Sequence, residues 1–231
     1  VLVKYFKLQV FKISIDDFYK TRKERILLSK SKHPLLLTRG VPGTHDIQLM
    51  VNLFKKVKKN TFRSINIPKF DKSIDDRCKK NSWFKLKKKP DILILEGWCV
   101  GARAEGNRSL NRPINVLEKN ADKKKIWRSY VNNQLKSKYS KLFDQLDSLL
   151  YLKAKNFKLL KRWRLKQEKK LKMKSGTKKN SKIMNEREVE TFMMTYQRIT
   201  QNMFKNAPKY SSAIIDLNEN HQIKKVRFKH A

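Results

Sequence analysis

Residues 91–97 read Asp-Ile-Leu-Ile-Leu-Glu-Gly, a short, continuous apolar run that ends in an acid and a glycine. Apolar runs of this length are typical of strands that are buried on both faces. We therefore predict a strand here, at the centre of a parallel sheet. In such sheets the functional groups lie in the loops that follow the C-terminal strand ends, so Glu96 is the first candidate site residue.

The sequence on either side of this run alternates between predicted strands and predicted helices. Further strands are indicated at residues 8–15, 149–154 and 213–217. Asp46 can cap a helix that begins at residue 47, and helical periodicity returns over residues 122–145. This alternation predicts an α/β fold with a parallel sheet flanked by helices.

The connecting segments are recognised by their composition. Residues 33–46 contain two prolines and two glycines and predict a loop, and a second loop is expected at residues 66–77. A lysine-rich linker at residues 174–182 separates two further predicted helices.

The overall composition fits one globular domain that spans residues 1–231. Hydrophobic residues make up 39% of the chain, enough to bury one core. Cys78 and Cys99 form no C-x-x-C pair, which favours free thiols in a reducing cytosol. No apolar run approaches the roughly 18 residues of a membrane span, so we expect a soluble, cytoplasmic protein with no membrane partner.

The net charge of +37 raises a nucleic-acid partner as an alternative. A nucleic-acid site would gather basic and aromatic residues on one surface, as the run Lys85–Lys89 beside Trp83 and Phe84 could do. However, 43 of the 57 basic residues are lysines, and they occur from Lys4 to Lys229. We interpret the excess as compositional and expect no specific nucleic-acid partner; a basic nucleic-acid-binding protein without enzymatic activity stays the alternative.

Residue types required for phosphoryl transfer occur at the predicted strand ends. Asp16 follows the strand at residues 8–15, and Glu96 ends the strand at residues 91–97. Phosphoryl transfer needs an acid to orient the attacking hydroxyl, an acid for magnesium and cations for the moving charge. Asp16, Glu96 and the arginines supply all three, although Asp16 and Asp17 could also serve only as a helix cap.

Four longer motifs make this interpretation specific. They are S-I-D-D-F-Y at 14–19, R-G-V-P-G-T-H-D at 39–46, P-K-F-D-K-S-I-D-D-R at 68–77 and L-E-G-W at 95–98. In these motifs the chain resembles the D-glycerate 3-kinases, a branch of the phosphoribulokinase and uridine kinase group of P-loop kinases. The resemblance implies a P-loop NTPase-like fold and a kinase that uses ATP and Mg²⁺ to phosphorylate a hydroxyl of a small acid such as D-glycerate.

The resemblance also implies roles for single residues. Asp16 would hold or deprotonate the acceptor hydroxyl, and Glu96 would lie near magnesium in the Walker B position. Arg162 and Arg164 of the motif R-W-R-L-K-Q-E would close over the phosphates from a helical lid, which we place with the linker in residues 155–185. The implied acceptor-binding residues are Asp17, Tyr19, Arg39, Thr44, His45, Asp46, Asp71, Lys72 and Arg77.

Two of these roles have plainer alternatives. His45 could be an ordinary hydrogen-bonding histidine, and the two arginines that flank Trp163 could simply be solvated.

The nucleotide motif of the family, G-x-x-x-x-G-K-[ST], does not occur in the 231 residues. Residues 101–106 have the glycine spacing, but Asn107 and Arg108 follow them, and they lie after the Walker B-like strand. We therefore interpret the sequence as an N-terminally truncated fragment that lacks the first strand and the P-loop and is inactive without them.

Overall fold

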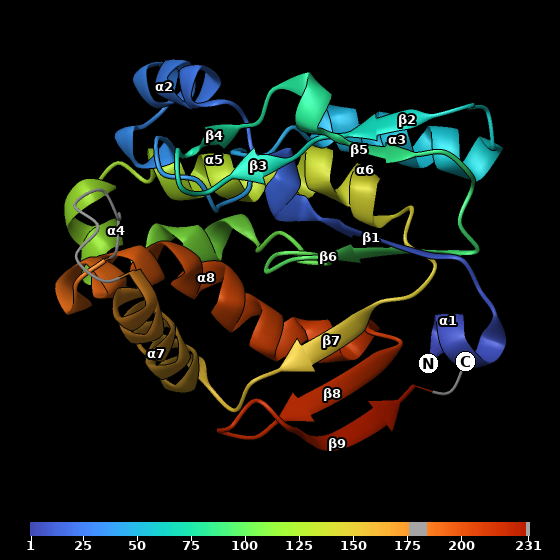
Figure 1. Cartoon of the computed structure of the whole chain (residues 1–231). Helices are drawn as coiled ribbons and strands as arrows, with labels where there is room; N and C mark the ends of the chain where they lie inside the picture. Colours follow the sequence, from blue (N-terminus) through green and yellow to red (C-terminus); the bar gives the residue numbers. More distant parts are fainter. Residues whose placement is uncertain (176–183, 230–231) are drawn as a thin grey trace. The chain divides into compact units, whose positions relative to one another are not determined.

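The computed structural model describes residues 1–175 and 184–229, which form two compact units (Figure 1). The first unit comprises Val1–Val100 and Ser129–Gln145. The second comprises Gly101–Arg128 and the residues from Leu146 onward. That the whole chain is one domain stays a prediction.

The first unit is organised around two parallel strands, β1 (Val10–Ser14) and β6 (Ile92–Glu96), which lie side by side in Figure 1. Their register pairs Ser14 with Glu96, so both strands end at the same level. This confirms the strands predicted at residues 8–15 and 91–97. It also brings the two predicted catalytic acids to the same sheet edge, because Asp16 follows β1 directly.

The prediction that residues 91–97 are buried on both faces is wrong. Every residue of β6 is at least partly exposed, and Ile94 is 38% exposed. The physical reason is that β6 has a single hydrogen-bonded neighbour, β1, among the described residues.

Side-chain caps start two helices of the first unit, and the second of these starts was predicted from the sequence. The helix α2 (Arg22–Ser31) starts with a capping box in which Thr21 and Glu24 bond each other's backbone N–H. The helix α3 (Ile47–Lys59) starts at Asp46, whose side chain accepts from the Leu49 N–H, as predicted. Its buried face, formed by Ile47, Met50, Leu53, Phe54 and Val57, contributes to the core.

Short elements complete the first unit. They are α1 (Leu2–Phe6), η1 (Ile15–Phe18), η2 (Pro34–Leu36), η3 (Lys80–Ser82), the π-helix η5 (Leu135–Tyr139) and α6 (Ser140–Phe143), with the antiparallel pairs β2 (Ile65–Ile67) and β5 (Phe84–Leu86), and β3 (Phe70–Asp71) and β4 (Asp76–Arg77). The segment 66–77, predicted as a loop, therefore contains the end of β2 and a small hairpin at residues 70–77. Residues 33–46 are a loop apart from η2, as predicted.

The second unit contains a three-stranded sheet in the order β7 (Leu150–Lys153), β8 (Ala213–Leu217), β9 (Ile223–Phe228). The pairing is parallel between β7 and β8 and antiparallel between β8 and β9. The first two strands were predicted from sequence, whereas β9 was not. Its sequence, IKKVRF, has all six residues exposed and carries no core pattern.

The helices of the second unit are η4 (Asn107–Asn111), α4 (Val116–Ala121), α7 (Phe157–Ser175) and α8 (Glu186–Tyr210). The helix α5 (Ile126–Gln134) begins in this unit and continues into the first. Figure 1 shows α8 beside α7, in agreement with the two helices predicted here. Residues 176–183, the main part of the predicted linker, lie outside the described residues.

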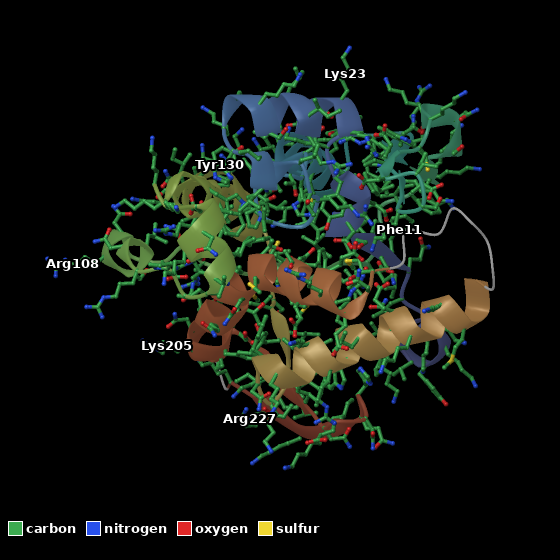
Figure 2. All side chains as sticks on the ribbon, turned by 90° about the vertical axis from the view of Figure 1, so that its left-hand side faces the viewer. Phe11, Lys23, Arg108, Tyr130, Lys205 and Arg227 are labelled. Atoms are coloured by element: carbon green, nitrogen blue, oxygen red, sulfur yellow. The ribbon has the colours of Figure 1, made fainter. Side chains whose placement is uncertain are left out.

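The surface carries the large basic excess. In Figure 2, Lys23 of α2 and Lys205 of α8 extend away from their helices, and both are exposed. None of the helices in the described ranges, 1–175 and 184–229, is both long and apolar enough to cross a bilayer.

Candidate active site

Asp16 lies in η1, the single turn that follows β1. Its carboxylate accepts two hydrogen bonds, one from the Tyr19 hydroxyl at 3.0 Å and one from the Lys72 ammonium at 2.7 Å. Tyr19 comes from the end of the same turn, and Lys72 comes from the hairpin of β3 and β4. Two predicted acceptor-binding residues are thus brought to the predicted catalytic acid.

These contacts decide the charge of Asp16. Burial raises the pKa of the carboxyl, but the hydrogen bond and charge of Lys72 and the hydrogen bond from Tyr19 outweigh burial, so the pKa lies below its usual 3.8. Asp16 is therefore ionised at neutral pH. An ionised carboxylate of low pKa is better suited to orient a hydroxyl than to abstract its proton early.

Asp17 and Glu96 form a second acidic pair beside Asp16. The Asp17 carboxylate accepts from the Phe70 N–H at 3.2 Å. The pKa of Asp17 is raised above its usual value, mainly by burial and further by the charges of Asp16 and Glu96. The hydrogen bond from the Phe70 N–H acts in the opposite direction but is the smaller effect. The Glu96 side chain is exposed and makes no hydrogen bond or ion pair within the described residues, which corrects the expectation of an acid at a buried strand end. No cluster of three metal-ligating side chains occurs in the part of the chain that the structure describes.

The loop at residues 39–46 is joined to η1 by backbone pairing. The Asp46 N–H donates to the Phe18 carbonyl at 2.7 Å, the Lys20 N–H donates to the Thr44 carbonyl at 2.8 Å, and Tyr19 and His45 form an antiparallel bridge. Thr44 is fully buried, and its hydroxyl donates to the Val41 carbonyl and accepts from the Gly40 N–H. The Thr44 side chain thus holds the loop together, and its acceptor-binding role stays a prediction.

His45 is almost completely buried, with 2% of its surface exposed. Its ring stacks on the Tyr19 ring at a centroid distance of 4.4 Å, and its Nδ1 lies 2.6 Å from the Tyr139 hydroxyl. Burial lowers the pKa of His45 to about 3, against the opposing effect of the Asp16 charge, so the ring is neutral at pH 7. Tyr139 was not foreseen from the sequence.

Arg77 and Asp46 connect the hairpin to the loop. The Arg77 guanidinium donates to the Tyr19 carbonyl from Nε at 3.1 Å and from Nη2 at 2.8 Å, and its Nη2 lies 3.5 Å from the Asp46 carboxylate. Asp46 also caps α3. Both predicted residues are therefore close to Tyr19, and Arg77 positions the Tyr19 backbone.

Asp71 and Arg39 are directed toward other partners. The Asp71 carboxylate accepts from the N–H and the hydroxyl of Ser73, and these bonds lower its pKa. Arg39 is paired with Asp75, which also lies 3.1 Å from the buried Arg25 guanidinium. The structure thus gives Asp71 a turn-stabilising contact and Arg39 an ion pair, and their acceptor-binding roles stay predictions.

Arg162 and Arg164 lie on α7 in the second unit. Arg162 pairs with Glu219 at 3.2 Å, and Arg164 pairs with Glu168 and bonds Gln167 at 2.8 Å. Trp163, between them, donates from its indole to the Glu219 carbonyl at 2.8 Å. The two arginines are thus ion-paired, and their role in a lid stays a prediction.

Gly97, which follows Glu96, is required by close packing. A Cβ there would lie 2.2 Å from the Ile15 Cγ2, in the core next to Asp16. We expect Gly97→Ala to lower the free energy of unfolding by about 1–3 kcal/mol, the usual cost of overpacking. Urea denaturation will measure this loss. Gly106→Ala is the matched control, because a Cβ at Gly106 meets nothing within 4 Å; equal effects at the two positions would contradict the packing described here.

The known proteins that this chain resembles in sequence and in structure include several kinases. The uncharacterized kinase mug58 of Schizosaccharomyces pombe is 33% identical over 195 residues, which cover 81% of this chain and 67% of that protein. The chloroplastic D-glycerate 3-kinase of Arabidopsis thaliana is 27% identical over 165 residues, 68% of this chain and 34% of that protein. The solved structure of D-glycerate 3-kinase from Cryptococcus neoformans var. grubii superimposes with a TM-score of 0.81 at 25% identity, covering 99% of this chain and 82% of that one. No protein-family model matches the chain.

The parallel strands, the flanking helices and these neighbours define the fold of a P-loop kinase. Within that class, the chain belongs to the D-glycerate 3-kinase-like family that includes the S. pombe kinase. The alternative of a nucleic-acid-binding protein receives no support from the comparisons.

Proposed function

We propose that these residues form the acceptor side of an ATP-dependent kinase that phosphorylates a hydroxyl of a small acid, D-glycerate. The observation that carries the proposal is the position of Asp16 at the end of β1, ionised and held by Tyr19 and Lys72. The named relatives from Arabidopsis and Cryptococcus support glycerate as the acceptor.

Cations near Asp16 suit an acidic acceptor. The Lys72 side chain is 61% exposed, and the Arg77 guanidinium donates to the carbonyl of Tyr19, the residue whose hydroxyl bonds Asp16. A carboxylate prefers such charged donors, and guanidinium groups can bind it through two parallel bonds. We assign Lys72 and Arg77 to the carboxylate of the acceptor. Arg39, which pairs with Asp75 of the same hairpin, is a further cation.

In the proposed reaction the Asp16 carboxylate accepts a hydrogen bond from the acceptor hydroxyl and takes its proton as transfer proceeds. The hydroxyl oxygen forms a bond to the γ-phosphorus of ATP, and the bond from that phosphorus to the bridging oxygen breaks, with the electron pair leaving on ADP. The products are ADP and the phosphorylated acid. Arg162 and Arg164, in the proposed lid, would stabilise the charge on the moving phosphoryl group.

The acids beside Asp16 fit magnesium. Mg²⁺ is commonly held by one or two carboxylates together with phosphate oxygens and water, so a three-ligand protein cluster is not required. Asp17 and Glu96 provide two carboxylates whose charges act on each other. When bound there, the ion would neutralise charge on the transferred phosphoryl group.

The cradle for the ATP phosphates is not among these residues, because the 231-residue sequence contains no G-x-x-x-x-G-K-[ST] motif. We propose that the activity requires a P-loop from outside the printed sequence and that both units and the lid then form one kinase domain. We also propose that this kinase acts in the cytoplasm.

The intact protein is expected to release ADP in the presence of MgATP and D-glycerate, measured with a coupled assay. The 231 residues alone should show no saturable, magnesium-dependent ATP binding by calorimetry, because they lack the ring of backbone donors that holds the phosphates.

Two results would contradict the proposal. Saturable ATP binding by the 231 residues alone would show that no P-loop is needed. ADP release by the intact protein that does not respond to glycerate, or to any other small hydroxy acid, would remove the proposed acceptor.

A further inference from the structure

His45 carries a buried ring nitrogen that has no hydrogen-bond partner within the described residues. Its Nε2 is enclosed and unpaired, while its Nδ1 lies 2.6 Å from the Tyr139 hydroxyl. The ring is fixed by Tyr19 on one face and by the edge-on ring of Tyr139, at centroid distances of 4.4 and 5.9 Å. Buried polar groups without partners are rare in folded proteins, and each needs an explanation.

The contacts of Tyr139 determine where the His45 proton lies. The Tyr139 oxygen accepts a bond from the Gly43 N–H at 3.0 Å, and an N–H group cannot accept in return. Tyr139 is fully buried, so its own hydroxyl proton needs an acceptor. The nearest acceptor in the described structure is the His45 Nδ1. With Nδ1 accepting, a neutral imidazole must carry its proton on Nε2.

We infer that Tyr139 is a positioning residue that fixes His45 as a neutral Nε2–H donor, and that this donor binds an oxygen of the acceptor substrate. The identity of the acceptor rests on the proposed function. His45 then donates a hydrogen bond to the substrate but cannot act as a general base, because its unprotonated nitrogen, Nδ1, already accepts the bond from the Tyr139 hydroxyl. The role of orienting the hydroxyl stays with Asp16.

The surroundings of the ring agree with this assignment. The Asp16 charge acts on the ring, the rings of Tyr19 and Tyr139 contact it, and the Cys99 thiol lies near Tyr139 and Asp16. Burial raises the pKa of the Cys99 thiol to about 12 and that of Tyr139 well above its usual value, so both stay protonated at pH 7. Tyr139 also ends the π-helix η5, and such turns occur frequently at functional sites.

The first test is the tautomer of His45 in the intact protein without substrate. Long-range ¹H–¹⁵N correlation spectra of protein labelled at its four histidines are expected to show the Nε2–H tautomer for His45, unchanged from pH 8 to pH 5. Comparison with His45→Gln assigns the signal. The Nδ1–H tautomer would overturn the role of Tyr139, whatever the substrate is.

The second test adds D-glycerate to the same unmutated sample. At saturation the Nε2–H proton should shift downfield as it gains a charged or hydroxyl acceptor. An unchanged shift at saturation would show that a buried water satisfies the nitrogen and would overturn the ligand contact. Failure of glycerate to bind would instead remove the proposed acceptor, while the tautomer result would stand.

A third measurement separates positioning from folding. Tyr139→Phe should raise KM for glycerate about tenfold with kcat within about twofold, because the lost contact is made equally in the ground and transition states. Tyr130→Phe is the matched control, since this half-buried tyrosine comes from the preceding helix α5. A fall in kcat with unchanged KM, or equal effects of both variants, would overturn the inference.

Discussion

Asp16→Asn is expected to lower kcat for glycerate phosphorylation by about 10³-fold in the intact protein, within the range typical of lost acid–base catalysis. Asparagine keeps the size of the side chain and can still accept from Tyr19 or Lys72, so the fold and the ATP affinity should be retained. What is lost is the negative charge that orients the acceptor hydroxyl and receives its proton. Initial rates of glycerate-dependent ADP release, with ATP affinity measured separately, provide the test.

A matched control for this variant is Asp144→Asn. Asp144 is an exposed carboxylate at the end of α6 in the same unit. Its replacement should leave kcat within about twofold. If Asp16→Asn behaved like Asp144→Asn, Asp16 would not be the residue that handles the hydroxyl.

Arg25→Met is expected to have the largest effect on stability, a loss of about 3–5 kcal/mol in the free energy of unfolding. The Arg25 side chain is fully buried and donates to three backbone carbonyls, those of Lys20, Leu37 and Asp75. Methionine fills much of the volume but leaves these three carbonyls without their donor, while the Asp75 carboxylate loses the Arg25 guanidinium and keeps its pair with Arg39. Urea denaturation monitored by circular dichroism measures the loss.

Arg22→Met on the same helix is the control for Arg25. The Arg22 side chain is 51% exposed, and its guanidinium lies 3.9 Å from Asp75. Exposed pairs of this kind contribute little, so the change should stay within about 0.5 kcal/mol. A loss of similar size for both variants would mean that the buried network around Arg25 is not what stabilises the loops.

The parts of the fold that were predicted correctly depend on local signals. The strand β6 follows from an uninterrupted apolar run, and the start of α3 follows from Asp46, whose capping bond spans only three residues. The strand β9 could not be predicted in this way. Its lysines and arginine give no pattern, and it forms because β8 provides a hydrogen-bonding edge.

In the candidate site, too, the residues with a local sequence signal were predicted and those that act through long-range contacts were not. Asp16 was found because an acid at the C-terminal end of a predicted strand is a recognisable pattern, and the structure places Tyr19 and Lys72 at its carboxylate. Arg25 and Tyr139 were missed, because each acts on residues far away in sequence: Arg25 bonds the carbonyl of Asp75, 50 residues on, and Tyr139 bonds His45, 94 residues back. Nothing local distinguishes them from the other arginines and tyrosines.

The ion pair between Lys72 and Asp16 means that the Asp16 carboxylate already has a counter-charge before any substrate binds. Under the proposed function, the incoming acid competes for the Lys72 ammonium, and its own carboxylate thereby releases Asp16 for the hydroxyl. A neutral polyol such as glycerol has the same hydroxyl but no carboxylate that could compete with Asp16 for the Lys72 ammonium. The ion pair would therefore make the site selective for a negatively charged substrate at the binding step, and the selection would depend on the substrate's charge rather than on its shape.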